Sequence, residues 1–246
     1  MSLGSLDCGE QVFGLAPHPH RDLLAVGRID GRVLLFAPSA AVEADAEPVP
    51  LASLVTHSRS CRAVAFNIPG DALYAACSDG TVVVFDEQGR ERSRMLVSEV
   101  ALNKIAAVGE SMLVVGDDEG GVSLLDTRSG AAAMQWTEHE DFVSSLLLDE
   151  GTRLLSTAGD CTLCEYDLRT AGPVRRSAEQ EDELLCVQSL RLGRKFVCGA
   201  LNGTILLFST DNLEDCSDRF PGHPAAVNCM LKVSLVLHYP MLQSPG

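Results

Sequence analysis

Residues 73–86 read LYAACSDGTVVVFD, in which two short apolar runs flank the turn residues Asp79 and Gly80. Asp-Gly and Asn-Gly pairs tolerate the positive φ angles that tight hairpin turns need. Short runs rich in Val, Leu, Ile and Phe are typical of strands. The segment therefore predicts a β-hairpin.

The same pattern occurs five times along the chain, at 23–36, 73–86, 113–126, 154–167 and 196–209. The turn residues are Asp30-Gly31, Asp79-Gly80, Glu119-Gly120, Asp160-Cys161 and Asn202-Gly203, so that neighbouring copies are 40–49 residues apart. In the fourth copy Cys161 takes the place of glycine. That turn must either be strained or belong to another type.

Further strand candidates flank the hairpins. Upstream of the copies lie VFGLAPHP (12–19), CRAVAFNI (61–68), LNKIAAV (102–108), FVSSLLLD (142–149) and LLCVQSLRL (184–192). Weaker candidates follow three of them: PLASLVTH (50–57), RMLVSE (94–99) and AAMQWTE (132–138). Four strands per repeat of about 41 residues are typical of a propeller blade. We therefore predict an all-β propeller, with a single domain over 1–236, a surface-loop insertion at 38–50 and an irregular tail at 237–246.

Composition and charge restrict the classes of function that the chain could have. The chain has 246 residues and a formal charge of −15, which disfavours direct binding to nucleic acid because phosphates attract basic surfaces. Its nine cysteines are scattered singly, as expected of free thiols in a reducing compartment. The N-terminus has no signal-peptide pattern, and no apolar run approaches the length of a membrane span. We therefore expect a soluble intracellular protein without a membrane partner.

Two short motifs could indicate chemistry, but each lacks residues that the chemistry requires. GDDEGG at 116–121 lacks the lysine of a phosphate-binding loop and the ligand spacing of a calcium loop, and it falls on a predicted turn. Cys161 and Cys164 form a C-x-x-C pair without the second pair or histidines that zinc requires. Motifs of nucleophilic catalysis are lacking as well. We expect no catalytic residues, no metal and no cofactor.

The repeats resemble the WD-repeat propeller family. Phe85-Asp86, Leu125-Asp126 and Tyr166-Asp167 stand at the Trp-Asp position of that family, although none has the tryptophan. Histidines precede several blades, near the Gly-His position of the family. The resemblance implies that such a histidine links a turn aspartate to a strand hydroxyl within its blade. The residues concerned are His139, Ser156, Asp160 and Tyr166 as the fullest set, with His57, Asp79 and His223 in other blades.

A closer resemblance is to a nucleolar branch of that family, which supports ribosomal RNA synthesis and large-subunit biogenesis. CRAVAF (61–66), GDDEGGVSLLDTR (116–128) and VCGALNGTILLF (197–208) carry it, in order and at similar spacing. The resemblance implies a non-catalytic scaffold in the nucleus and nucleolus, with a cytoplasmic pool as an alternative, and pre-ribosomal proteins as partners. It also implies a seven-bladed ring of about 287 residues. We therefore expect five blades and the start of a sixth in an open, C-terminally truncated ring.

Residues 154–169, LLSTAGDCTLCEYDLR, point to an alternative function. They resemble the motif by which WD-repeat substrate receptors dock to the damaged-DNA-binding adaptor of cullin–RING ubiquitin ligases. Arg169 follows Asp167 at two residues, and Arg128 stands at the equivalent place in the preceding blade. Arginine can form forked hydrogen bonds to an acidic partner surface. The candidate docking residues are therefore Arg128, Asp167 and Arg169.

Overall fold

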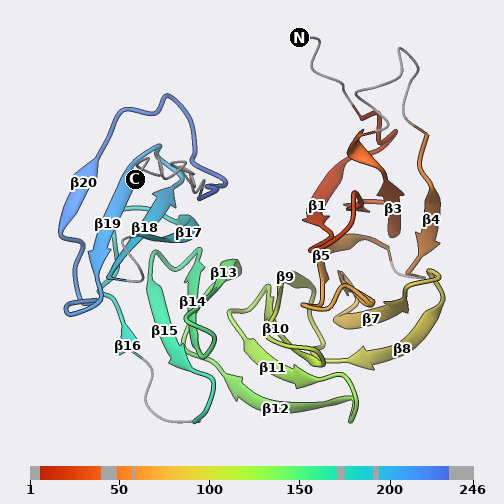
Figure 1. Cartoon of the computed structure of the whole chain (residues 1–246). Helices are drawn as coiled ribbons and strands as arrows, with labels where there is room; N and C mark the ends of the chain where they lie inside the picture. Colours follow the sequence, from red (N-terminus) through yellow and green to blue (C-terminus); the bar gives the residue numbers. More distant parts are fainter. Residues whose placement is uncertain (1–5, 40–48, 57–58, 171–174, 191–193, 233–246) are drawn as a thin grey trace, which may run out of the picture.

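The computed structural model describes residues 6–39, 49–56, 59–170, 175–190 and 194–232. These residues form five antiparallel sheets of four strands each, and every sheet uses four strands that follow one another in the sequence. Figure 1 shows the sheets side by side on an arc, as the blades of a propeller. The predicted all-β propeller with five complete blades is confirmed.

The strands of each blade are numbered from the inside outward. Blade 1 contains β1 (Val12–Pro17), β2 (Leu24–Arg28), β3 (Arg32–Phe36) and β4 (Ala52–Val55). Blade 2 contains β5 (Cys61–Phe66), β6 (Ala72–Cys77), β7 (Thr81–Asp86) and β8 (Glu91–Leu96). Blade 3 contains β9 (Leu102–Ala107), β10 (Met112–Asp117), β11 (Val122–Asp126) and β12 (Ala131–Trp136). Blade 4 contains β13 (Val143–Asp149), β14 (Arg153–Ala158), β15 (Leu163–Asp167) and β16 (Arg175–Arg176). Blade 5 contains β17 (Leu184–Leu190), β18 (Lys195–Ala200), β19 (Ile205–Ser209) and β20 (Asp218–Phe220).

The innermost strands β1, β5, β9, β13 and β17 pack against one another in that order around the propeller axis. Blades 1 and 5 stand on opposite sides of the opening in the arc (Figure 1). The inner strands therefore form the wall of a central channel.

No helix among the described residues is long and apolar enough to cross a membrane.

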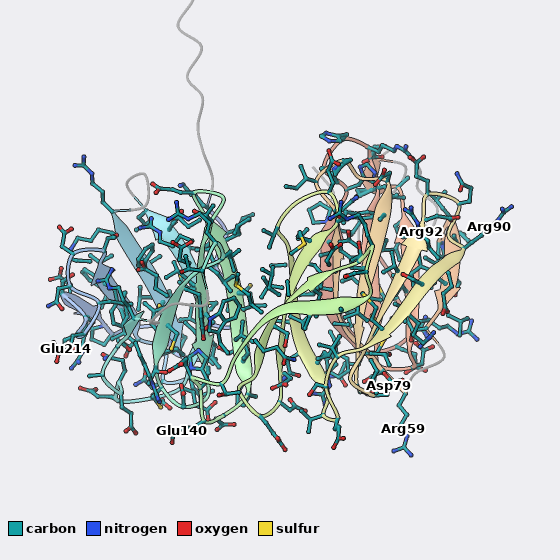
Figure 2. The ribbon with its side chains drawn as sticks, turned by 90° about the horizontal axis from the view of Figure 1, so that it is seen from below. Arg59, Asp79, Arg90, Arg92, Glu140 and Glu214 are labelled. Atoms are coloured by element: carbon teal, nitrogen blue, oxygen red, sulfur yellow. The ribbon has the colours of Figure 1, made fainter. Side chains whose placement is uncertain are left out.

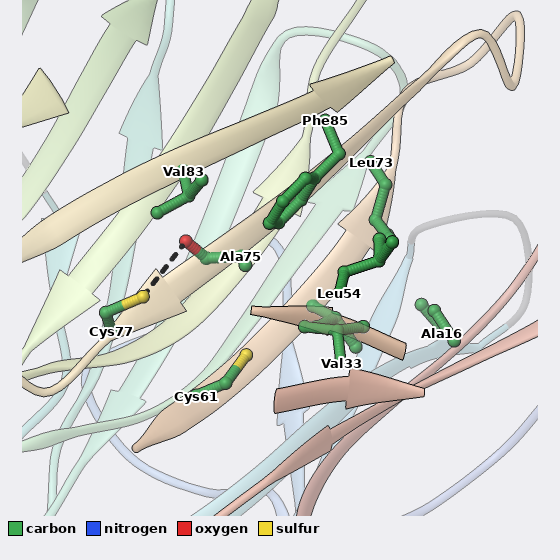
Figure 3. Close-up of a cluster of buried hydrophobic side chains, with 11 residues drawn as sticks. Ala16, Val33, Leu54, Cys61, Leu73, Ala75, Cys77, Val83 and Phe85 are labelled. Atoms are coloured by element: carbon green, nitrogen blue, oxygen red, sulfur yellow. Dashed lines mark hydrogen bonds between the residues drawn. The ribbon is translucent and has the colours of Figure 1, made fainter. Parts of the chain in front are cut away.

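The hydrophobic core lies between neighbouring blades. In β7, Val83 and Phe85 pack toward blade 1 with Val33 and Leu54 (Figure 3). Val82 packs toward blade 3. Central strands are thus buried on both faces, which explains why their sequences are continuously apolar rather than alternating. Full burial of each large apolar side chain stabilises the fold by roughly 1.5–3 kcal/mol.

The hairpin turns are present at all five predicted places, and their geometry is uniform. Gly31, Gly80, Gly120 and Gly203 have positive φ angles of 76–87°, and the N–H of Gly80 donates to the Cys77 carbonyl at 3.3 Å. The preceding aspartates, glutamate and asparagine do not have positive φ. Each turn is therefore of the kind that ends in a single left-handed residue. Cys161 takes this conformation too, with φ of 64°, so that the fourth turn keeps the common type at the cost of strain.

Residues 221–232 follow blade 5 without forming a strand. The N–H of Val227 donates to the Ala200 carbonyl at 3.1 Å, and its side chain meets Gly199. Val143 meets Gly116 in the same way at the start of blade 4. Val227 therefore occupies the place where a sixth inner strand would begin. Most of the predicted insertion at 38–50 and all of the tail at 237–246 lie outside the described residues, and the domain limit at residue 236 stays a prediction.

Candidate interaction surfaces

The propeller presents two faces that differ in the segments forming them. The turns between second and third strands meet the segments that link consecutive blades: Gly80 lies against Ser98, and Gly120 against His139. We call this side the linker face. The turns between first and second strands and between third and fourth strands form the opposite side, the outer-turn face. Figure 2 shows Arg59, Asp79 and Glu140 along the linker face and Arg90 on the other side.

A buried hydrogen-bond network surrounds His139, which lies in the segment linking blades 3 and 4. Nδ1 of His139 donates to Asp160 Oδ2 at 3.0 Å, and Nε2 shares a hydrogen bond of 2.6 Å with Ser156 Oγ. The Ser156 hydroxyl in turn donates to the Tyr166 hydroxyl at 3.2 Å. The side chains of His139 and Asp160 are 0% and 7% exposed. The structure therefore brings together all four members of the set that the sequence indicated.

Electrostatics fix the charge states in this network. Burial disfavours the ionised form of Asp160, but hydrogen bonds from His139, Thr162 and the Glu140 amide outweigh it and lower the pKa to about 2. Burial raises the pKa of Tyr166 far above its usual range. Asp160 is thus ionised and Tyr166 neutral at pH 7. A satisfied buried network of this kind rigidifies the strands that it joins.

Among the residues that the structure describes, the corresponding positions of blades 2 and 5 show no such network. Asp79 accepts hydrogen bonds from the backbone and the hydroxyl of Thr81, at 3.2 and 2.6 Å. His57 lies outside the described residues. His223 is exposed beside Gly203, and its side chain forms no hydrogen bond within the part of the chain that the structure describes.

Arg128 and Arg169 adopt the same geometry on adjacent blades. Arg128 donates from Nε and Nη2 to the carboxylate of Asp126, at 3.2 and 3.0 Å, and Arg169 forms the same fork with Asp167, at 2.9 and 2.6 Å. These hydrogen bonds hold the pKa of Asp167 at about 2. The arginine side chains remain 76% and 69% exposed, so that they can reach a partner.

Arg128 also lies at the edge of a cavity between blades 2 and 3. The cavity has a volume of about 690 Å³ and is lined by polar groups that include Asn67, Tyr74, Arg92 and Glu110. Its lining includes turns between first and second strands, at Asn67 and Glu110, and the turn of Arg128 between third and fourth strands. The cavity therefore opens on the outer-turn face. The arginine pair and the His139 network therefore belong to opposite faces of the propeller.

A polar cluster lies on the channel wall, at residues that the sequence did not single out. Nη1 of Arg62 donates to Asp118 Oδ2 at 2.8 Å and to Asn103 Oδ1 at 2.5 Å. Arg62 and Asn103 both follow the first residue of an inner strand. A signal for this cluster existed: the repeat spacing places polar residues at the same point of consecutive inner strands.

Other motifs are explained by the fold. Burial raises the pKa of the Cys164 thiol to about 12, and Cys161 and Cys164 are both free cysteines. The side chain of Asp117, in GDDEGG, accepts hydrogen bonds from the Glu119 and Gly121 amides of its own turn. Within the described ranges, no group of three or more His, Cys, Asp or Glu residues is arranged to hold a metal ion.

Comparisons with known proteins agree with this architecture. The family model of the WD domain, G-beta repeat, matches residues 48–86, and that of the outer membrane protein assembly factor BamB matches 78–193. WD repeat-containing protein 55 of Arabidopsis thaliana is 35% identical over 232 residues, which are 93% of this chain and 65% of the relative. The proteins of the same name from Rattus norvegicus and Homo sapiens are 37% and 36% identical over 90% of this chain. The chain spans 58–65% of the length of these relatives.

Proposed function

The chain belongs to the WD-repeat β-propeller family, and on that premise we propose that it is a non-catalytic interaction scaffold in the nucleolus. Its role there would be to support ribosomal RNA synthesis and biogenesis of the large ribosomal subunit. The observation that carries this proposal is the similarity to WD repeat-containing protein 55 over 90–93% of the chain, spread over all five blades. The blades supply rigidity, and their turns supply the surface that differs from blade to blade.

The net charge of the chain favours proteins rather than RNA as its partners. The net charge of −15 repels phosphate backbones and attracts basic protein surfaces, which RNA-binding proteins carry. An acidic propeller is therefore suited to hold RNA-binding proteins during assembly. Pre-ribosomal proteins are the class of partner that we propose.

Affinity purification tests this function. The tagged chain, recovered from nuclease-treated cell extract, is expected to bring down nucleolar pre-ribosomal proteins, because the contacts are between proteins and do not require RNA. Mass spectrometry identifies the partners, and fluorescence of the tagged chain gives its location. Recovery of cytosolic partners alone, or loss of all partners on nuclease treatment, would contradict the proposal.

The paired arginines favour a second candidate function, docking to the adaptor of a cullin–RING ubiquitin ligase. Arg128 and Arg169 leave adjacent blades from equivalent positions, and each is oriented by an aspartate two residues earlier. Exposed, pre-oriented guanidinium groups lose little side-chain freedom when they bind a carboxylate. This geometry gives the motif at 154–169 a physical basis beyond its sequence.

A double substitution tests the docking. Arg128→Ala with Arg169→Ala is expected to weaken adaptor binding at least tenfold, because arginines at the centre of an interface often dominate its affinity. The measurement is titration calorimetry with purified adaptor. Arg90→Ala, on the same face of blade 2, is the matched control. The melting temperature should not change, since exposed ion pairs contribute little to stability. Equal affinity of the double variant and the control would eliminate this candidate.

A further inference from the structure

A cavity of about 520 Å³ lies in the central channel. Its walls come from the inner strands, the turn between β10 and β11, the residue before β13 and the segment after blade 5: Phe13, Arg62, Asn103, Lys104, Asp118, Phe142, Val143, Ser144, Leu185, Asn228 and Cys229. The volume is in the range of small-molecule sites, which combine apolar walls with a few convergent polar groups. Neither the scaffold function nor adaptor docking assigns a role to this cavity.

The positive charge of Arg62, on the wall of this cavity, is already neutralised. Arg62 forms an ion pair with Asp118 at 2.8 Å, and Asn103 hydrogen-bonds to both partners. Both charged side chains are about one-third exposed, with values of 32% and 37%. This cluster therefore contributes shape and hydrogen-bonding groups to the cavity but little net charge.

Lys104 differs from Arg62, because its charge has no counterion in the described part of the chain. Among the described residues, its ammonium group forms no hydrogen bond and no ion pair. Burial lowers its pKa, an effect that the nearby thiols of Cys186 and Cys229 oppose. The sequence has two other lysines: Lys195 donates to the hydroxyls of Ser209 and Ser217, and Lys232 is exposed.

A half-buried cation without a partner lowers the stability of the fold. A methionine of similar length would fill the same space without that cost. Conflicts of this kind between a residue and its surroundings are concentrated at binding sites, where a ligand supplies the missing charge. For Lys104, a ligand that supplies the missing charge would be an anion.

The other residues of the cavity wall indicate which kind of anion fits. Phe13, Phe142 and Leu185 present apolar surface, and Ser144 and Asn228 present neutral hydrogen-bonding groups. A highly charged phosphate group would meet only one unpaired cation and two aromatic rings. The geometry points to a carboxylate attached to an apolar group as the ligand, with the carboxylate on Lys104 and the apolar group against the two phenylalanines. A free organic acid and an acidic residue of a peptide share this chemistry.

Matched ligands test the proposal on the whole chain. The probes are 3-phenylpropionate with its neutral amide, and the capped dipeptide acetyl-Phe-Glu-amide with acetyl-Phe-Gln-amide. Titration calorimetry is expected to show at least tenfold tighter binding of an acid than of its neutral counterpart, since each pair differs only in charge. Binding of the organic acid alone assigns a small-molecule site, and binding of the peptide acid alone assigns a peptide site. Equal binding of the acids and their neutral counterparts would overturn the proposal.

Variants of Lys104 provide the second test. Lys104→Met is expected to abolish the tenfold preference for the acid and to raise the melting temperature by about 2–4 °C, because an unpaired cation is removed. Lys104→Arg keeps the charge and should retain part of the preference, and Lys195→Met should retain all of it. An unchanged preference in Lys104→Met, or its equal loss in Lys195→Met, would show that Lys104 does not hold the carboxylate.

Discussion

Gly80→Ala is expected to lower the free energy of unfolding by roughly 3–5 kcal/mol, a large effect for the addition of one methyl group. Gly80 has φ of 77°, which costs an L-residue about 1–2 kcal/mol. Its new Cβ would lie 1.9 Å from the Ser98 carbonyl oxygen and 2.9 Å from that of Val100. Both obstacles are backbone atoms of the segment leading into blade 3, so that relief requires the two blades to separate. Urea denaturation followed by circular dichroism measures the loss.

Two other substitutions separate the cost of backbone strain from that of the clash. Gly130 has φ of 69° and its nearest obstacle is 3.9 Å away, so that Gly130→Ala should show only the conformational cost of about 1–2 kcal/mol. The reverse change, Cys161→Gly, should stabilise the chain by about 1 kcal/mol, because it removes a non-glycine residue from φ of 64°. If Gly80→Ala costs no more than Gly130→Ala, the contact between blades is not as tight as the structure indicates.

The second and third strands of each blade could be predicted from the sequence because burial dictates their composition. The hairpin expected at 73–86 is formed by β6 (Ala72–Cys77) and β7 (Thr81–Asp86). The outer strands could not be placed so well. The candidate at 94–99 corresponds to β8 (Glu91–Leu96), which begins three residues earlier, in a polar stretch that is mostly exposed. An outer strand has solvent on one edge, so that hydropathy does not mark where it begins.

The arginine pair and the polar cluster on the channel wall also differ in how far the sequence predicts them. The equivalent placement of Arg128 and Arg169 follows from the repeat, because residues one period apart lie at the same point of adjacent blades. The channel cluster of Arg62 and Asp118 joins residues 56 positions apart in different blades. The repeat places Arg62 on the channel wall but does not determine which side chain of the next blade it meets. The sequence does not single out Lys104 either, and it is identified by the lack of a counterion among the residues that the structure describes.

His139→Ala is expected to destabilise the chain by roughly 2–4 kcal/mol. The substitution leaves a cavity in blade 4 and deprives Asp160, which is 7% exposed, of its principal hydrogen-bond donor. It also removes the 2.6 Å partner of the buried Ser156 hydroxyl. His20→Ala, an exposed histidine of blade 1, is the matched control and should change stability little. Thermal and urea unfolding measure both variants.

The pH dependence of stability gives the same network a second readout. The pKa of Asp160 is lowered from 3.8 to about 2 in the fold, so that its contribution is present above pH 4 and is lost as the pH falls through about 2. For a group in this environment the contribution is roughly 1–2 kcal/mol. Asp160→Asn should remove that part of the acid sensitivity. His139→Ala should reduce it, because the imidazole hydrogen bond lowers the pKa more than the other hydrogen bonds do.

A double-mutant cycle distinguishes a coupled network from a simple loss of packing. If His139 acts by holding the ionised Asp160, then Asp160→Asn in the His139→Ala background should cost less than it does in the original chain, because the stranded charge has already lost its partner. Strictly additive losses would mean that His139 stabilises blade 4 only by filling space. In that case the short hydrogen bonds to Asp160 and Ser156 would contribute no more than the water that replaces them.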